Sequence, residues 1–146
     1  MKIKNIFLYI FSSRFRNHYY IKKISSNIKR NKSARNKVNH LGNYISKDAI
    51  IGNNIFMPHP IGIVIGNGVK IGDGCSIYQN VTIGQKNEKY PKIGNNVIIF
   101  PNSAIIGDII IGDNVVIGAG SVVIYNVPDN AIIAGNPSKI IRYRND

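Results

Sequence analysis

The chain has 146 residues, 44% of them hydrophobic, and a formal net charge of +12 at pH 7. This length fits one domain, or one domain with an extension. The single cysteine excludes an internal disulfide framework and is compatible with a reducing cytoplasm. The charge is uneven, because residues 1–47 hold twelve Lys or Arg and no acid, whereas residues 48–146 hold seven of each sign. No nucleic-acid-binding motif accompanies the basic block, so we expect no nucleic-acid partner.

Residues 1–43 mix aromatic and aliphatic side chains with Lys and Arg, which predicts a basic helical N-terminal extension. The apolar run at residues 6–11 is too short to span a bilayer and no cleavage site follows it, so we expect no signal peptide. The extension can contact an acidic membrane surface, or it can cap the end of the domain that follows. The cap is the preferred interpretation, and the two can coexist. We therefore expect a cytoplasmic protein, with the inner membrane surface as an alternative location.

Beyond residue 44, large apolar residues recur every six positions. Fourteen positions in three phases follow this period, and they are Ile45, Ile51, Met57, Ile63, Ile65, Ile71, Ile77, Ile83, Ile93, Ile99, Ile105, Ile111, Ile117 and Val123. A period of six fits neither an α-helix nor long alternating strands. It fits short strands joined by tight corners, where Gly and Asn accept unusual backbone angles. Three hexads close a triangular coil, coils stack about 4.8 Å apart, and the repeated Ile points inward. Residues 44–146 are thus predicted to form one β-solenoid domain of four to five coils.

The period slips twice, and both slips contain residues that can carry chemistry. Two extra residues follow Met57, and four extra residues follow Ile83. The first slip contains His59 between two prolines, so this segment should bend out of the coil and place the imidazole on the surface. The second slip makes a polar loop at residues 85–92.

Four segments of the repeat match a known family. They are HPIGIVIG at 59–66, YQNVTIG at 78–84, IGAGSVV at 117–123 and AGNPSKIIR at 134–142. They resemble the hexapeptide-repeat acyltransferases, in particular serine O-acetyltransferases and the shorter enzymes that O-acetylate polysaccharides. The resemblance covers about residues 44–142. It implies a left-handed parallel β-helix, acetyl-CoA as the acyl donor, and a homotrimer with each active site between two subunits. The motifs are specific for the fold and for acyl-CoA use, and they say little about the acceptor.

In this family, the residue that matches His59 is the general base that takes the proton of the acceptor hydroxyl. Without the resemblance, His59 would be read as a loop histidine with no role. The resemblance also implies cofactor contacts, which fall on Gly84, Gln85, Pro101, Ala119, Lys139 and Arg142. The implied acceptor contacts fall on Tyr90, Lys86 and Lys92, although each can equally be an exposed loop residue. Backbone N–H groups of Gly84 or Gln85 would stabilise the oxyanion, and the two basic tail residues would bind phosphates. No cluster of metal-ligand residues is present in the sequence, so we expect no catalytic metal.

Three positions depart from the serine acetyltransferase pattern. Pro58 and Tyr44 stand where those enzymes place aspartates, and Tyr90 stands where they place a histidine. Because the ammonium group of serine needs a carboxylate partner, these changes favour a sugar hydroxyl of a surface polysaccharide, or of its precursor, as the acceptor. The predicted function is an acetyl-CoA-dependent O-acetyltransferase acting on such a glycan. The alternatives are a serine O-acetyltransferase of cysteine biosynthesis and a non-catalytic trimeric solenoid that serves as a binding module.

Overall fold

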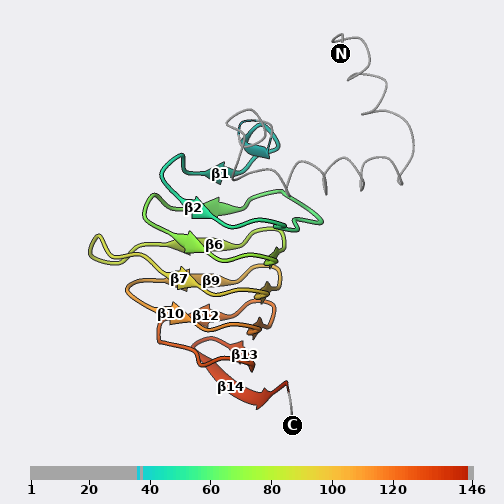
Figure 1. Cartoon of the computed structure of the whole chain (residues 1–146), viewed down its shortest axis with the longest axis vertical. Coiled ribbons are helices and arrows are strands. Elements are labelled where there is room, and N and C mark those ends of the chain that lie inside the picture. The colour runs from blue at the N-terminus through green and yellow to red at the C-terminus, as the bar shows by residue number, and fades with distance from the viewer. Residues whose placement is uncertain (1–35, 37, 145–146) are drawn as a thin grey trace.

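A computed structural model describes residue 36 and residues 38–144 of the chain. The described part is a tapering stack of coils that begins at a helical turn ending at Asn39 (Figure 1). Most of the predicted helical extension at 1–43, and with it the predicted membrane contact, lies outside the described residues. No helix within the described ranges has the length and apolar character that a membrane crossing requires.

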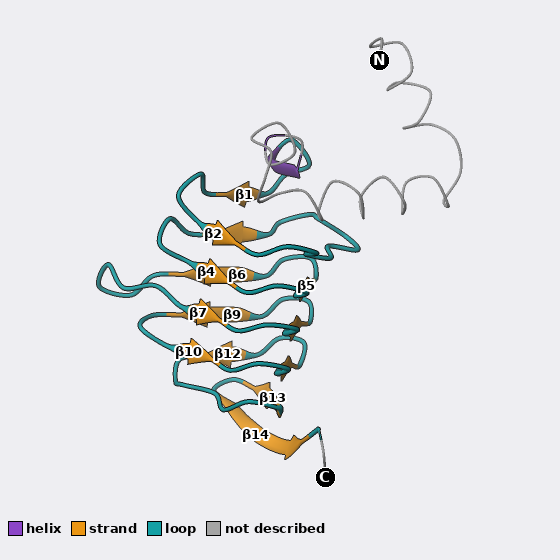
Figure 2. Cartoon of the chain, in the orientation of Figure 1, coloured by secondary structure: helices purple, strands orange, loops and turns teal. Residues whose placement is uncertain are grey.

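The stack is built from three sheets, which form the three faces of the solenoid (Figure 2). Sheet A consists of β1 (Tyr44–Ile45), β3 (Val64–Ile65), β6 (Thr82–Gly84), β9 (Ala104–Ile106) and β12 (Val122–Val123). Sheet B consists of β2 (Ile50–Ile51), β4 (Lys70–Ile71), β7 (Lys92–Ile93) and β10 (Ile110–Ile111). Sheet C consists of β5 (Ser76–Ile77), β8 (Ile98–Ile99), β11 (Val116–Ile117), β13 (Ala131–Gly135) and β14 (Ser138–Tyr143).

Neighbouring strands within each sheet pair in parallel, except for the last pair. Ile65 of β3, for example, lies opposite Ile45 on one side and Ile83 on the other. Only β13 and β14 pair antiparallel, and this hairpin ends the stack. Because the chain passes through sheet A five times, the predicted solenoid of four to five coils is confirmed.

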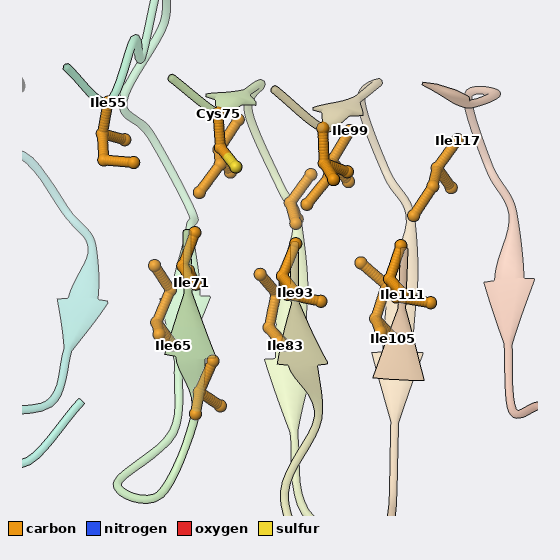
Figure 3. Close-up of a cluster of buried hydrophobic side chains, with 14 of the residues drawn as sticks. Ile55, Ile65, Ile71, Cys75, Ile83, Ile93, Ile99, Ile105, Ile111 and Ile117 are labelled. Atoms are coloured by element: carbon orange, nitrogen blue, oxygen red, sulfur yellow. The ribbon is translucent and has the colours of Figure 1, made fainter. Parts of the chain in front are cut away.

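The predicted ladder forms the core. All fourteen ladder positions are buried, and none of these side chains is more than 5% exposed. Figure 3 shows Ile71, Ile93 and Ile111 in one row. A second inward row, which the six-residue period did not predict, lies two residues before the ladder. Its members include Ile55, Val69, Cys75, Val81, Val97, Ile109 and Val115. Most hexads therefore bury a second side chain, which adds to the apolar surface that holds consecutive coils together.

The corners explain the Gly and Asn of the repeat. We name the corners by the sheets that they join: corner AB, corner BC and corner CA. Every coil places a left-handed residue at corners BC and CA, which at corner CA means Gly62, Asn80, Asn102 and Gly120, with φ between 57° and 69°. Asn and Gly adopt this conformation at lower cost than other residues. The prediction that these two residue types form the corners is confirmed.

Cys75 belongs to the second inward row and should be chemically inert in the folded protein. Its thiol is buried, and Sγ lies 3.2 Å from the carbonyl oxygen of Gly94. Burial raises the pKa of this thiol from 9.0 to about 11. The thiolate fraction near pH 8 is therefore about 100-fold lower than for an ordinary thiol. We expect a thiol reagent to label the native protein at least about 100-fold more slowly than the urea-unfolded protein. Equal labelling rates would contradict the buried position of Cys75.

Candidate active site

Corner CA of the first coil carries His59. Five residues, 58–62, lie between Met57 and the next inward side chain, whereas the following coils use three. Both prolines that flank His59 are buried, and His59 itself is exposed. The N–H of Ile61 donates to the carbonyl oxygen of His59 at 2.9 Å, which makes a γ-turn centred on Pro60. Two fixed φ angles and this turn direct the imidazole outward, away from the isoleucine core.

In the described chain, corner CA and the strands of sheets A and C that meet there carry no Lys, Arg, Asp or Glu, except for the basic residues of β14. All acids and bases between residues 47 and 129 lie at corner AB, on sheet B or at corner BC. These residues are Lys47, Asp48, Lys70, Asp73, Lys86, Glu88, Lys89, Lys92, Asp108, Asp113 and Asp129. Within the described chain, His59 therefore carries the one imidazole at corner CA, and imidazole is the side chain most often used as a general base. Among the described residues, no carboxylate lies at this corner to orient the imidazole.

Two of the predicted cofactor residues share corner CA with His59. Pro101 and Ala119 stack on this corner, where the N–H of Gly120 donates to the carbonyl oxygen of Pro101 at 2.9 Å. At about 4.8 Å per coil, they lie about 10 and 14 Å along the stack from His59. Pro101 is half-buried and Ala119 is exposed, so atoms of both residues reach the surface of this corner. Lys139 and Arg142 lie on β14 and are also exposed.

The loop at residues 85–92 is an ordered hairpin at corner AB. Lys86 and Lys89 exchange backbone hydrogen bonds of 3.0 and 3.1 Å. Asn87 and Glu88 between them have φ values of 52° and 62°, as a type I′ turn requires. The ammonium group of Lys89 lies 2.9 Å from Asp108 of the next coil, and this hydrogen-bonded ion pair raises the pKa of Lys89 and lowers that of Asp108. The hairpin is thus held against the solenoid at its base.

Tyr90 and Lys92 have positions that the loop prediction did not foresee. The ring of Tyr90 is half-buried and lies on the corner glycines of the preceding coil. A Cβ added at Gly68 would collide with the ring, and one added at Gly66 would lie 3.2 Å from Cε1. Tyr90 therefore anchors the hairpin to the core. Lys92 stands on the outer face of sheet B, opposite Lys70.

One chain does not bring all of the predicted site residues together. His59, Pro101 and Ala119 lie at corner CA, whereas Gly84, Gln85 and the loop lie at corner AB. Sheet A separates the two corners, and the widened corner 58–62 and the loop project on opposite sides of the stack (Figure 1). A site that uses both groups therefore needs a second chain.

Two residues at corner CA were missed by the sequence analysis. Gln79 lies one coil beyond His59, and its Oε1 atom is buried without a hydrogen-bond partner in the described chain. Such an oxygen is normally paired, so a ligand or a second chain can supply the missing donor here. Asn43 donates to the carbonyl oxygen of Pro60, next to His59. Neither residue belongs to the six-residue pattern. Gln79 lies in the segment YQNVTIG at 78–84, but its residue type did not single it out, and no motif includes Asn43.

Comparisons with known proteins agree with this architecture. Residues 90–124 match the model of the family described as bacterial transferase hexapeptide (six repeats). A serine acetyltransferase of Synechococcus elongatus is 42% identical over 101 residues, which is 66% of this chain and 41% of that protein. The soybean serine acetyltransferase in complex with serine is 38% identical, with a TM-score of 0.62 over 64% of this chain and 40% of that one. A serine acetyltransferase in complex with CoA is 39% identical, with a TM-score of 0.63 over 64% and 40%.

These similarities concern the repeat region. The chain spans less than half the length of the curated relatives it matches. The shared part is the left-handed β-helix of these enzymes, which confirms the predicted handedness. By its repeats and by its fold, the described part of the chain is a hexapeptide-repeat β-helix of the type found in serine acetyltransferases.

Proposed function

We propose that the protein is an acetyl-CoA-dependent O-acetyltransferase with His59 as the general base. The observation that carries this proposal is the position of His59. It is exposed between two buried prolines, on a corner where the described residues include no other imidazole and no carboxylate. The similarity to a serine acetyltransferase in complex with CoA supports acetyl-CoA as the donor. Pro101 and Ala119 on the same corner, with Lys139 and Arg142 on the closing hairpin, are the proposed cofactor contacts.

The proposed reaction needs one base and one donor of hydrogen bonds to an oxyanion. An imidazole nitrogen of His59 takes the proton of the acceptor hydroxyl while its oxygen attacks the thioester carbonyl carbon. The tetrahedral oxyanion is stabilised by backbone N–H groups, for which Gly84 and Gln85 are the candidates. When the intermediate collapses, the C–S bond breaks and the CoA sulfur receives the proton from the imidazolium. The products are the O-acetyl ester and CoA.

The separation of the two corners supports a homotrimer as part of this proposal. Corner CA of one chain would face corner AB of the next, so that His59 meets the loop at 85–92 of its neighbour. Sheets A and C, which flank His59, carry no charge outside β14, whereas sheet B exposes Lys70 and Lys92. Uncharged faces are the ones that a subunit interface can bury. A monomer in sedimentation at micromolar concentration would contradict the shared site.

The comparisons favour serine as the acceptor over the polysaccharide hydroxyl that the sequence analysis preferred. The curated relatives are named serine acetyltransferases, and one solved neighbour holds serine. The charged groups that serine needs can come from corner AB of a second chain, where Lys86 and Glu88 are exposed on the hairpin. These two residues would pair with the carboxylate and the ammonium group of the amino acid.

A neutral sugar hydroxyl remains the second candidate, because the described residues of corner CA supply no charged partner to an amino acid. To decide between the two, the purified protein is given acetyl-CoA with either L-serine or neutral sugars and polysaccharide, and release of CoA and the mass of the product are measured. We expect at least about tenfold higher kcat/KM with serine. Preferential acetylation of a sugar would reverse this choice of acceptor and leave the acetyltransferase proposal intact. No transfer to either acceptor would overturn both.

A further inference from the structure

Within the described residues no complete coil precedes the first one, and two asparagine side chains supply part of the backbone pairing at this end of the stack. The amide of Asn39 accepts from the N–H of Ile45 at 2.9 Å and donates to its carbonyl oxygen at 3.2 Å. Asn39 thus acts as a strand partner for the exposed edge of β1. Exposed strand edges need such cover, because their backbone groups are otherwise unpaired.

The second of these side chains, Asn43, contacts the segment that carries His59. Its Nδ2 donates to the carbonyl oxygens of Pro60 at 2.6 Å and Val38 at 2.8 Å, and its Oδ1 accepts from the N–H of Ile63 at 2.9 Å. One half-buried amide therefore joins the helical turn to both ends of the 60–63 segment. Pro60 lies inside the widened corner 58–62, and Ile63 is the first residue after it.

The later corners do not need such a clamp. Each of them pairs with the coil before it through a backbone bond, for example from the N–H of Asn102 to the carbonyl oxygen of Gln79 at 3.2 Å. At the first corner, the equivalent bond runs from Gly62 to Gly42 at 3.1 Å, and it fixes only the end of the five-residue segment. The middle of the segment, at Pro60, is held from outside by Asn43.

We propose that Asn43 is a positioning residue for His59, an inference that rests on the proposed role of His59 as the base. Pro60 is the centre of the γ-turn whose acceptor is the His59 carbonyl oxygen. Its ring also restricts the backbone of His59. A displacement of the Pro60 carbonyl is therefore transmitted through a rigid residue to the backbone of His59. A shift of about 1 Å in a catalytic group can cost about 100-fold in rate.

The test compares Asn43→Asp with Asn39→Asp. In both variants the side chain keeps an oxygen that can accept from a backbone N–H. In both, the Nδ2 group that donates to a backbone carbonyl oxygen is replaced by a carboxylate oxygen, which cannot donate. We expect both to lower the melting temperature. Asn43→Asp should lower kcat for acetyl transfer about 10- to 100-fold, while its KM for acetyl-CoA should change less than about threefold. Asn39→Asp should keep kcat within about twofold of the wild-type value. The imidazole NMR signals of His59, assigned with a His59→Asn variant, should move only in Asn43→Asp.

Equal losses of kcat in the two variants, or unmoved His59 signals in Asn43→Asp, would overturn the positioning role. If Asn43→Asp does not fold, Asn43→Ser and Asn39→Ser make the same comparison without an added charge. A wild-type protein that acetylates no acceptor overturns the proposed function instead. In that case the His59 signals alone decide whether Asn43 holds this segment.

Discussion

Replacement of His59 by asparagine is expected to lower the rate of acetyl transfer about 10²- to 10⁴-fold. This is the range that a general base contributes when it removes a proton as the nucleophile attacks. Asparagine cannot accept that proton near neutral pH, and the described part of corner CA holds no other group that can replace His59. The loss should fall on kcat, because the predicted cofactor contacts at Pro101 and Ala119 remain in place. Release of CoA at saturating acetyl-CoA and acceptor measures the effect.

His40 gives the matched control for this substitution. It is exposed directly after the helical turn that ends at Asn39, and it lies outside the segment 58–62 that carries His59. His40→Asn should therefore retain the wild-type rate. Both variants should keep the wild-type circular dichroism spectrum, because neither side chain belongs to the buried rows. If His59→Asn transfers acetyl groups as fast as the wild type, His59 is not the base. A wild type with no transferase activity at all would favour the non-catalytic solenoid.

Replacement of Ile111 by alanine is expected to lower the free energy of unfolding by about 2–5 kcal/mol, the usual cost of truncating a fully buried aliphatic side chain. Ile111 is 1% exposed and stacks between Ile93 of the preceding coil and Val127 of the next. In a solenoid, each coil packs on its neighbours, so a cavity in one interface weakens the packing between consecutive coils directly. Urea denaturation at a fixed protein concentration measures the change.

The neighbouring residue of the same strand is the control. Ile110 is 54% exposed and points outward from sheet B. Ile110→Ala makes the same chemical change one position away and should alter the free energy of unfolding by less than about 0.5 kcal/mol. If the two variants were destabilised equally, the inward and outward assignment of β10 would be wrong. Because strand residues alternate between faces, a shift of one residue would exchange these two positions.

The six-residue period was sufficient to predict the solenoid, the number of coils and the fourteen buried ladder positions. It succeeded because each hexad repeats one large aliphatic residue, and only an interior stack requires that regularity. The second inward row escaped detection because its members differ in size and chemistry, as Cys75, Val97 and Ile55 show. A further shortening was also missed: Val127 follows Val123 by four residues and pairs with Ile111. An interval of four residues after the last ladder position has no later repeat with which it could be compared, so the sequence alone does not show it as a shortened hexad.

The surface position of His59 could be predicted because local chemistry determines it, through two prolines and two extra residues. Tertiary structure alone decided what surrounds it. The loop at 85–92 follows sheet A while His59 follows sheet C, so one chain places them on different corners. Tyr90 was expected to touch a ligand; the structure adds that its ring lies on two glycines of the preceding coil, a contact that the repeat pattern did not predict. Asn43 is seventeen residues from Pro60, and only the folding of the first coil brings them into contact. A repeat pattern determines which of its own positions stack on one another in consecutive coils. It does not determine the neighbours of residues in the segments that interrupt the repeat, and these neighbours are set by the tertiary structure.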